Sequence, residues 1–301
     1  MSSPAPRLHA ILAREAPTAV VIRRGPAKRV CTVGWDRRDD SFSLGQWVAG
    51  RIYERRCDLS PDGRHFIYFT MKGFMQAGDE IGVFTAIARA PWLRALALWP
   101  QEETWGGGGA FLDDCRFWLN EGYEELQPHF DESGLGRVRA TPEGFGGIGE
   151  CPSIYVPRLL RDGWREVDDA GTDAGVREPI VHVVKELPGG WRLLKVFGSK
   201  YRAGWDPCSD DDGDGREDPG PVYREGHALL RPDGQRIDGS DWEWADWDAV
   251  RDRVVFARAG KLFAADLAER PFEPAELFDF ATLVYSRKRR PVPYQGGRPK
   301  A

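Results

Sequence analysis

One short acidic segment carries residues with the spacing of a calcium-binding loop. Its candidate ligands are Asp210, Asp212, Asp214 and Asp218. Together with Gly215, the first three match the opening of an EF-hand loop, in which carboxylates at alternate positions converge on Ca²⁺. Pro221 occupies the twelfth position, where a bidentate glutamate belongs, and neither flank predicts a helix. The segment is therefore either a partial calcium site or a solvated acidic loop, and calorimetry with millimolar Ca²⁺ separates the two.

Four consecutive glycines form a second candidate for binding. Gly106, Gly107, Gly108 and Gly109 directly follow Trp105. Glycine lets the backbone approach another group closely, and that group is either a ligand or a crowded neighbouring strand. The segment predicts either a backbone-lined binding surface or steric relief where strands converge.

Three aspartates occupy comparable positions near expected strands: Asp58, Asp113 and Asp246. If they converge, paired carboxylates there suit hydrolysis of a glycosidic bond or ligation of a metal. The alternative is that each one accepts backbone N–H bonds in its own turn. The sequence contains no G-x-S-x-G, HExxH or Walker A motif, and its five histidines are isolated. The absence of a compact catalytic motif favours binding over catalysis.

Charge is distributed unevenly along the chain. The formal net charge is −5, and residues 286–301 hold six basic residues and no acid, which leaves about −11 on the rest. An acidic body repels phosphate backbones, so we expect no nucleic acid on the main surface. The basic tail is the one segment suited to a nucleic acid or an acidic partner, and we expect it to be disordered.

The remaining composition indicates a globular chain. Hydrophobic residues make up 41% and charged residues 30% of the 301 residues, which excludes a disordered protein. No apolar run reaches the roughly 18 residues needed to span a membrane, and the first residues do not resemble a signal peptide. Five widely spaced cysteines without a C-x-x-C pair are typical of reduced thiols. We therefore expect a cytoplasmic protein that does not associate with membranes.

Short β-branched and aromatic runs separated by turn residues predict an all-β protein. The expected strands are residues 18–22, 29–33, 64–70, 84–88, 93–98, 116–119, 153–156, 180–184, 191–196, 253–257 and 261–264. Two segments, residues 7–15 and 274–280, look helical. Because no ten-residue helical pattern separates the expected strands, parallel βαβ units are excluded.

An internal repeat adds detail to this interpretation. Gly34-Trp35-Asp36 recurs as residues 204–206, and in both copies a tyrosine follows the aspartate after 17 residues. Each copy continues to a Leu-x-Pro-Asp-Gly turn, at residues 59–63 and 230–234. Proline, aspartate and glycine suit successive positions of a tight turn, so each turn should join two antiparallel strands.

The segments 53–69 and 244–263 resemble blades of TolB-like and WD40-like β-propellers. The whole chain is similar to bacterial propeller-like proteins that are themselves uncharacterised, so the resemblance implies a fold and no catalytic residues. Blades of about 40–50 residues predict a single propeller of five blades, and six also fit the tryptophan spacing. The expected organisation is an N-terminal extension (1–16), the propeller (17–285) and the basic tail (286–301).

The leading functional hypothesis is a non-enzymatic scaffold that binds a protein partner or a small molecule at its channel mouth and loops. Rigid blades that display variable loops suit recognition. The alternative is a propeller hydrolase with carboxylate- or metal-dependent chemistry, for which Asp58, Asp113 and Asp246 are the candidate residues.

Overall fold

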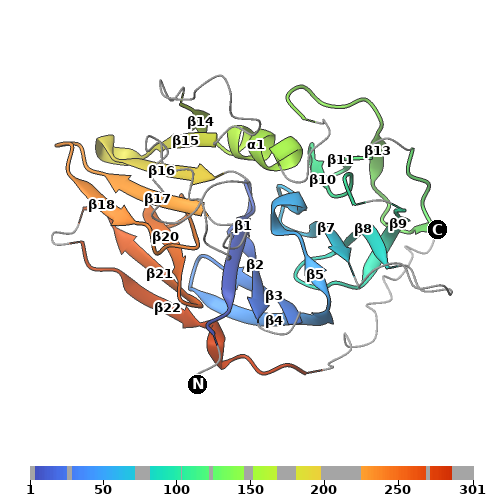
Figure 1. Cartoon of the computed structure of the whole chain (residues 1–301), viewed down its shortest axis with the longest axis horizontal. Helices are drawn as coiled ribbons and strands as arrows, with labels where there is room; N and C mark the ends of the chain where they lie inside the picture. The colour runs from blue at the N-terminus through green and yellow to red at the C-terminus, as the bar shows by residue number, and fades with distance from the viewer. Residues whose placement is uncertain are drawn as a thin grey trace, which may run out of the picture.

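The described part of the chain is mostly β-sheet (Figure 1). The computed structural model describes residues 4–25, 29–71, 82–102, 104–121, 125–145, 152–167, 181–197, 225–268 and 272–286. Over these ranges it contains five open sheets, one α-helix and three 3₁₀ helices. The predicted all-β class is therefore confirmed. Among the described helices, none is long and apolar enough to cross a membrane.

Sheets 1 and 2 come first along the chain and are antiparallel throughout. Sheet 1 consists of β1 (Arg7–Leu12), β2 (Thr18–Gly25), β3 (Arg29–Asp36) and β4 (Ser41–Ala49). Sheet 2 consists of β5 (Arg51–Ile52), β6 (Asp58–Leu59), β7 (His65–Met71), β8 (Val83–Arg89), β9 (Ala95–Pro100) and β12 (Phe130–Asp131). The 3₁₀ helix η1 (Glu54–Arg56) connects β5 to β6.

Three further sheets and the helix follow. Sheet 3 consists of β10 (Gly109–Phe111), β11 (Arg116–Leu119) and β13 (Gly136–Val138), and its β11–β13 pair is parallel. The helix α1 (Pro152–Arg161) leads into sheet 4, which consists of β14 (Arg165–Glu166), β15 (Val181–Glu186), β16 (Arg192–Phe197), β17 (Glu225–Leu230) and β18 (Arg236–Gly239). Sheet 5 consists of β19 (Trp244–Asp248), β20 (Arg253–Arg258), β21 (Lys261–Asp266) and β22 (Ala275–Asp279). The 3₁₀ helices η2 (Pro188–Gly190) and η3 (Phe280–Thr282) follow β15 and β22.

The hydrophobic core is divided into clusters that lie between pairs of sheets. In β2, Val20 and Ile22 pack with sheet 2, whereas Ala19 and Val21 pack with sheet 5. Side chains of a strand alternate between its two faces, so sheet 1 is covered on both. A third cluster joins sheets 2 and 3, and a fourth joins α1, sheet 4 and sheet 5. Sheet 1 therefore packs against sheets 2 and 5, sheet 2 against sheet 3, and sheet 4 against sheet 5, whereas α1 contacts both sheet 3 and sheet 4.

Contacts near β1 connect these layers. The strand β1 contacts β6 of sheet 2 and also β19 and β20 of sheet 5. The strand β10 contacts β6, the helix α1 contacts both β10 and β14, and β17 contacts β19. Figure 1 accordingly shows β1 near the middle of the view, with α1 above it and strands on either side.

A buried ionic network joins sheets 1 and 5. The guanidinium of Arg37 lies 3.1 Å from the carboxylate of Asp248, and both side chains are almost completely buried. Arg253 pairs with Asp248 at 3.0 Å and with Asp40 at 2.5 Å. Arg37 and Asp40 follow β3 of sheet 1, whereas Asp248 and Arg253 belong to sheet 5. These pairs attach the first sheet to the last one.

Three of the expected elements are wrong. The expected helix at residues 7–15 is mainly the strand β1, because both of its faces are covered and it pairs with β2 from Arg7 to Leu12. The expected helix at 274–280 is mainly the strand β22, which pairs with β21. The expected strand at 153–156 lies in α1, where Tyr155 and Leu159 are four residues apart on one buried side of the helix.

Both Pro-Asp-Gly turns join antiparallel strands, as predicted. The first turn joins β6 to β7 and the second joins β17 to β18. Gly63 and Gly234 have φ values of +72° and +86°, which glycine adopts readily. The two turns occupy different places in their sheets, and residues 204–206 and 223 of the second copy lie outside the described residues.

Candidate functional site: a charged cavity beside the helix

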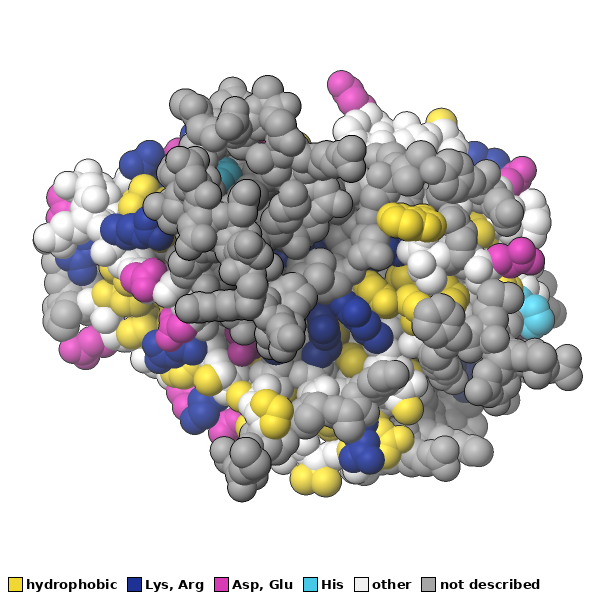
Figure 2. Space-filling model, viewed as in Figure 1, with side chains coloured by type: hydrophobic (Ala, Val, Ile, Leu, Met, Phe, Trp, Pro, Cys, Tyr) yellow, Lys and Arg dark blue, Asp and Glu magenta, His cyan; other side chains and the backbone are white. Residues whose placement is uncertain are grey.

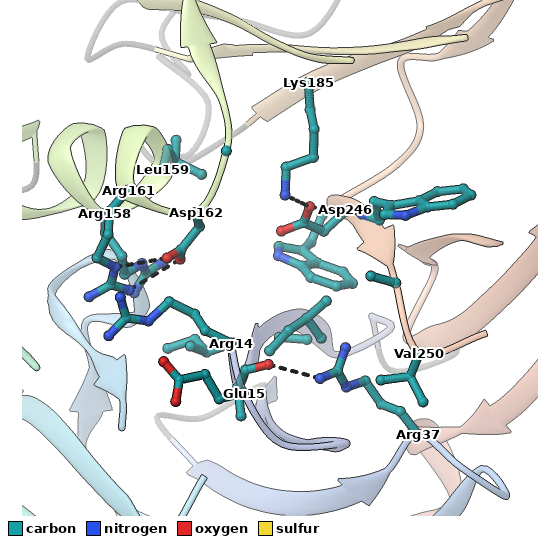
Figure 3. A pocket seen from close by; sticks show the side chains of 18 of the residues that line it. Arg14, Glu15, Arg37, Arg158, Leu159, Arg161, Asp162, Lys185, Asp246 and Val250 are labelled. Carbon is teal, nitrogen blue, oxygen red and sulfur yellow. Dashed lines mark hydrogen bonds and ion pairs between the residues drawn. The ribbon is translucent and has the colours of Figure 1, made fainter. Parts of the chain in front are cut away.

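A large cavity lies among β1, the loop after it, α1, sheet 4 and sheet 5 (Figure 3). Its volume is about 750 Å³, and small-molecule sites usually measure about 300–1,000 Å³. Six basic residues line it: Arg14, Arg37, Arg158, Arg161, Lys185 and Lys195. Four acidic residues also line it: Glu15, Asp162, Glu186 and Asp246. The lining is therefore net basic in a chain that is net acidic.

The end of α1 is fixed beside this cavity by its own sequence. The N–H of Gly163 donates to the carbonyl of Leu160, and the N–H of Trp164 donates to the carbonyl of Leu159. This pair of bonds is a Schellman motif, with Gly163 at a φ of +89°. Leu159 and Trp164 are buried together in the cluster of sheets 4 and 5. The motif and this contact hold the last turn of the helix against the cavity.

Three guanidinium groups gather on this side of the cavity, and we name Arg14, Arg158 and Arg161 the arginine group (Figure 3). Arg14 and Arg161 both donate to the carbonyl of Phe111, over 3.5 and 3.1 Å. Arg158 donates to the carbonyl of Cys57. Like charges held this close repel one another, so the group favours a bound anion.

The members of the arginine group differ in their carboxylate partners. Arg161 forms ion pairs with Asp58 and Asp162, at 2.7 and 2.8 Å. Among the described residues, no carboxylate lies within ion-pair distance of Arg14 or Arg158. Arg14 is exposed, whereas only 4% of Arg158 is exposed. A nearly buried cation therefore faces the cavity without a direct counter-ion from the described chain.

The opposite wall carries aromatic and paired polar groups. Lys185 donates to the carboxylate of Asp246 over 2.5 Å, and Figure 3 shows this pair across the cavity from the arginine group. Trp244 and Trp247 flank Asp246 on β19 and also line the cavity. Trp244 is buried, whereas Trp247 is partly exposed. This wall therefore offers indole surface beside one ammonium group and one carboxylate.

A buried polar cluster lies beneath the cavity. The hydroxyl of Tyr155 donates to Glu225 over 2.6 Å, and Lys195 donates to the Tyr155 hydroxyl over 3.1 Å. Burial alone would raise the pKa of Glu225, but the charges of Lys195 and Arg55 hold it well below its usual range. The cluster therefore keeps an ionised carboxylate in the interior, held by cations on several sides.

His9 adds no charge to this cluster near neutral pH. Burial, together with the nearby charge of Arg158, lowers the pKa of His9 to about 3, although the charge of Glu225 opposes the shift. Its ring nitrogen Nε2 lies 3.4 Å from a guanidinium nitrogen of Arg158. The neutral imidazole therefore adds no positive charge beside Arg158.

The three candidate catalytic aspartates have different surroundings. Asp58 is completely buried behind Arg161 and also accepts the backbone N–H of Phe111 at 2.8 Å. Asp113 is outside the cavity lining and accepts backbone N–H groups from its own turn, together with the side chain of Arg116. Asp246 lines the cavity and is paired with Lys185. Of the three, only Asp246 therefore lines the cavity, whereas Asp58 is buried behind Arg161 and Asp113 lies elsewhere.

The four glycines are buried and pack against protein. Gly107 and Gly108 have φ values of +97° and +82°. A Cβ on Gly107 would lie 2.4 Å from the ring of Phe69, and one on Gly108 would lie 2.2 Å from the carbonyl oxygen of Arg56. Gly106 and Gly109 are buried too, whereas Trp105 is 54% exposed. None of these five residues lines the large cavity.

The candidate calcium ligands Asp210, Asp212, Asp214 and Asp218 lie outside the described residues. Within the described residues, no group of three or more His, Cys, Asp or Glu side chains could hold a metal ion. The calcium interpretation of the acidic loop therefore stays a prediction.

Sequence reasoning missed the arginine group. Arg14 belongs to a segment that was expected to be helical, and Arg158 follows a run that was expected to be a strand. One signal was available, because Arg-Asp-Gly-Trp after an apolar run is typical of a helix C-terminus. It predicts the end of α1 but not the approach of Arg14, which depends on the contact between β1 and β6.

Comparison with models of known protein families and with curated proteins gives no significant match to the chain. The description of the cavity therefore depends on its geometry alone.

We predict that Asp58→Asn lowers the free energy of unfolding by about 3 kcal/mol, because Arg161 loses its buried carboxylate partner and keeps only Asp162. Burial alone would raise the pKa of Asp58, but the charge and hydrogen bonds of Arg161 lower it below the usual value. Its contribution to stability is thus complete above the unfolded pKa of about 4 and is lost as the pH falls through the lower folded pKa. Urea denaturation at pH 7 and at pH 3 measures both effects. The control, Asp113→Asn, removes an exposed pair and should have a far smaller effect.

We predict that Gly108→Ala lowers the free energy of unfolding by roughly 2–4 kcal/mol, through backbone strain and the clash with Arg56. Gly134 is a matched control, because its φ is +72° and a Cβ added to it would have no other atom within 4 Å. Gly134→Ala should cost only the backbone term, roughly 1 kcal/mol. Equal losses in urea denaturation would show that the close approach contributes nothing.

Proposed function

We propose that the five sheets are blades of a five-bladed propeller and that the chain binds a small anionic ligand in its large cavity. The ring is supported by the clusters that sheet 1 shares with sheets 2 and 5, sheet 2 with sheet 3, and sheet 4 with sheet 5. It is also supported by contacts between elements of neighbouring sheets. These are β1 with β6, β6 with β10, β10 with α1, α1 with β14, β17 with β19, and β19 with β1. In this arrangement α1 lies between sheets 3 and 4.

One observation carries the functional proposal: Arg14 and Arg158 face the cavity and have no carboxylate partner among the described residues. A guanidinium is always charged at neutral pH and presents donors in a planar fork that suits carboxylate or phosphate oxygens. Arg158 is nearly buried, so water screens its charge weakly. An anionic ligand would supply the missing counter-charge.

Positive charge on the viewed surface is local. Figure 2 shows a group of Lys and Arg side chains near the middle of the face viewed in Figure 1. Elsewhere the net charge of the chain is negative, so an anion is attracted locally rather than by the whole molecule.

The binding role is preferred to hydrolysis because the candidate carboxylates are already engaged. General acid–base chemistry needs a carboxyl group that can reach the substrate and exchange a proton. Asp58 is completely buried behind Arg161, and Asp246 is paired with Lys185. The described wall of the cavity is therefore better suited to holding an anion than to cleaving a glycosidic bond.

We expect inorganic phosphate and pyrophosphate to bind to the purified chain, with pyrophosphate tighter because it carries more charge. Arg14→Gln should weaken both by about tenfold, since a charge-assisted hydrogen bond contributes roughly 1.5–3 kcal/mol. Isothermal titration calorimetry in a phosphate-free buffer at low salt measures the affinities.

The matched control for this experiment is Arg64→Gln, which removes an exposed arginine outside the cavity lining. Because Arg14 is also exposed, neither substitution should disturb folding. Absence of phosphate and pyrophosphate binding, or equal binding by Arg14→Gln and the original chain, would contradict the proposed function.

A further inference from the structure

We propose that the ligand of the large cavity is a nucleoside monophosphate, held with its phosphate at the arginine group and its base against the wall formed by β19. This inference depends on the proposed anion-binding function and makes it more specific. It follows from the placement of two chemically different walls on opposite sides of one cavity (Figure 3).

The arginine group suits a phosphate better than a carboxylate. A carboxylate has one charge and two oxygens, which one guanidinium can satisfy in a bidentate pair. A phosphomonoester carries between one and two negative charges at neutral pH and has three terminal oxygens. Arg14 and Arg158 are both without a direct carboxylate partner among the described residues, whereas the N–H groups of Arg161 are engaged by Asp58, Asp162 and Phe111. Donors of Arg14 and Arg158 can therefore converge on one dianionic group.

The opposite wall suits a flat ring with polar edges. Trp247 lines the cavity, is partly exposed and packs against the cluster of sheets 4 and 5. Base–aromatic stacking on such a ring is tolerant of base identity. Beside it, the carboxylate of Asp246 can accept an N–H bond, and the ammonium of Lys185 can donate one. Nucleobases carry both kinds of group on their edges. A sugar phosphate would fill the arginine side and leave the indole uncovered.

The size and charge of the site favour one nucleotide over a strand. A volume of about 750 Å³ lies in the range of sites for single small molecules. A nucleic-acid strand would have to cross the rest of a net acidic chain, which repels successive phosphates. A monophosphate places one phosphate at the arginine group and none on the acidic surroundings.

The decisive experiment compares ligands that share a phosphate and differ in the base. Calorimetric titrations use inorganic phosphate, ribose 5-phosphate and the monophosphates of adenosine, guanosine, cytidine and uridine. At least one nucleotide should bind tenfold or more tightly than ribose 5-phosphate, because stacking adds affinity. It should also quench tryptophan fluorescence, which ribose 5-phosphate should leave nearly unchanged.

Substitutions on each wall assign the two parts of the ligand. Trp247→Leu should abolish the advantage of the nucleotide over ribose 5-phosphate and keep phosphate binding, whereas Trp247→Phe should restore most of that advantage. Trp105→Leu, which removes an exposed indole outside the cavity lining, is the matched control and should have no effect. Arg14→Gln should weaken all the phosphate ligands alike.

The outcomes distinguish this inference from the proposed function. If phosphate and ribose 5-phosphate bind through Arg14 but no nucleotide binds more tightly, the nucleotide inference is wrong and anion binding stands. If none of the phosphate ligands binds, both proposals are wrong. If a nucleotide binds tightly and Trp247→Leu has no effect on its advantage in a folded protein, the assigned position of the base is wrong and the inference fails.

Discussion

Asp58 joins three parts of the molecule through one buried carboxylate. It belongs to β6 of sheet 2, accepts the backbone N–H of Phe111 in sheet 3, and receives two guanidinium bonds from Arg161 of α1. An isolated buried charge is very unfavourable, so these donors must come together when Asp58 is buried. The position of the helix end, and with it the basic side of the cavity, depends on this arrangement.

Asp58 was a candidate catalytic residue because of its position near an expected strand. In the structure it is held by Arg161 and by the N–H of Phe111, which keep it ionised. The charge that it removes from Arg161 leaves Arg14 and Arg158 as the cations of the cavity without direct carboxylate partners among the described residues. His9 is neutral near pH 7, so it adds no further positive charge beside Arg158. The charge that faces the cavity therefore depends as much on which cations are neutralised as on which are present.

Much of the fold could be predicted from the sequence, because local patterns determined it. Runs of β-branched and aromatic residues located β2, β3, β7, β8, β11, β15, β16, β20 and β21, and the two Pro-Asp-Gly turns located their strand pairs. The error at β1 has a clear cause. Strands such as β1 are covered on both faces, so they lack the alternation that distinguishes a strand from a short helix. Only tertiary contacts decide between the two.

The cavity was much harder to predict, since its residues come from distant segments. Asp246 was selected from sequence and does line it, but Arg14 and Arg158 are separated by more than a hundred residues. They lie on the same cavity because β1 contacts β6 and Arg158 bonds to Cys57 just before β6. No spacing rule contains that information. The four glycines are the opposite case. Their signal is clear in the local sequence, and in the structure it marks a closely packed backbone.

The packing of sheet 5 against sheet 1 has a consequence for synthesis on the ribosome. Chains emerge from the N-terminus, so β1 and β2 are made about two hundred residues before the strands that cover one of their faces. Until β19–β21 arrive, Leu8, Val21 and Val33 have no partner from sheet 5. One apolar face of the first sheet therefore stays uncovered by sheet 5 until most of the chain has been made.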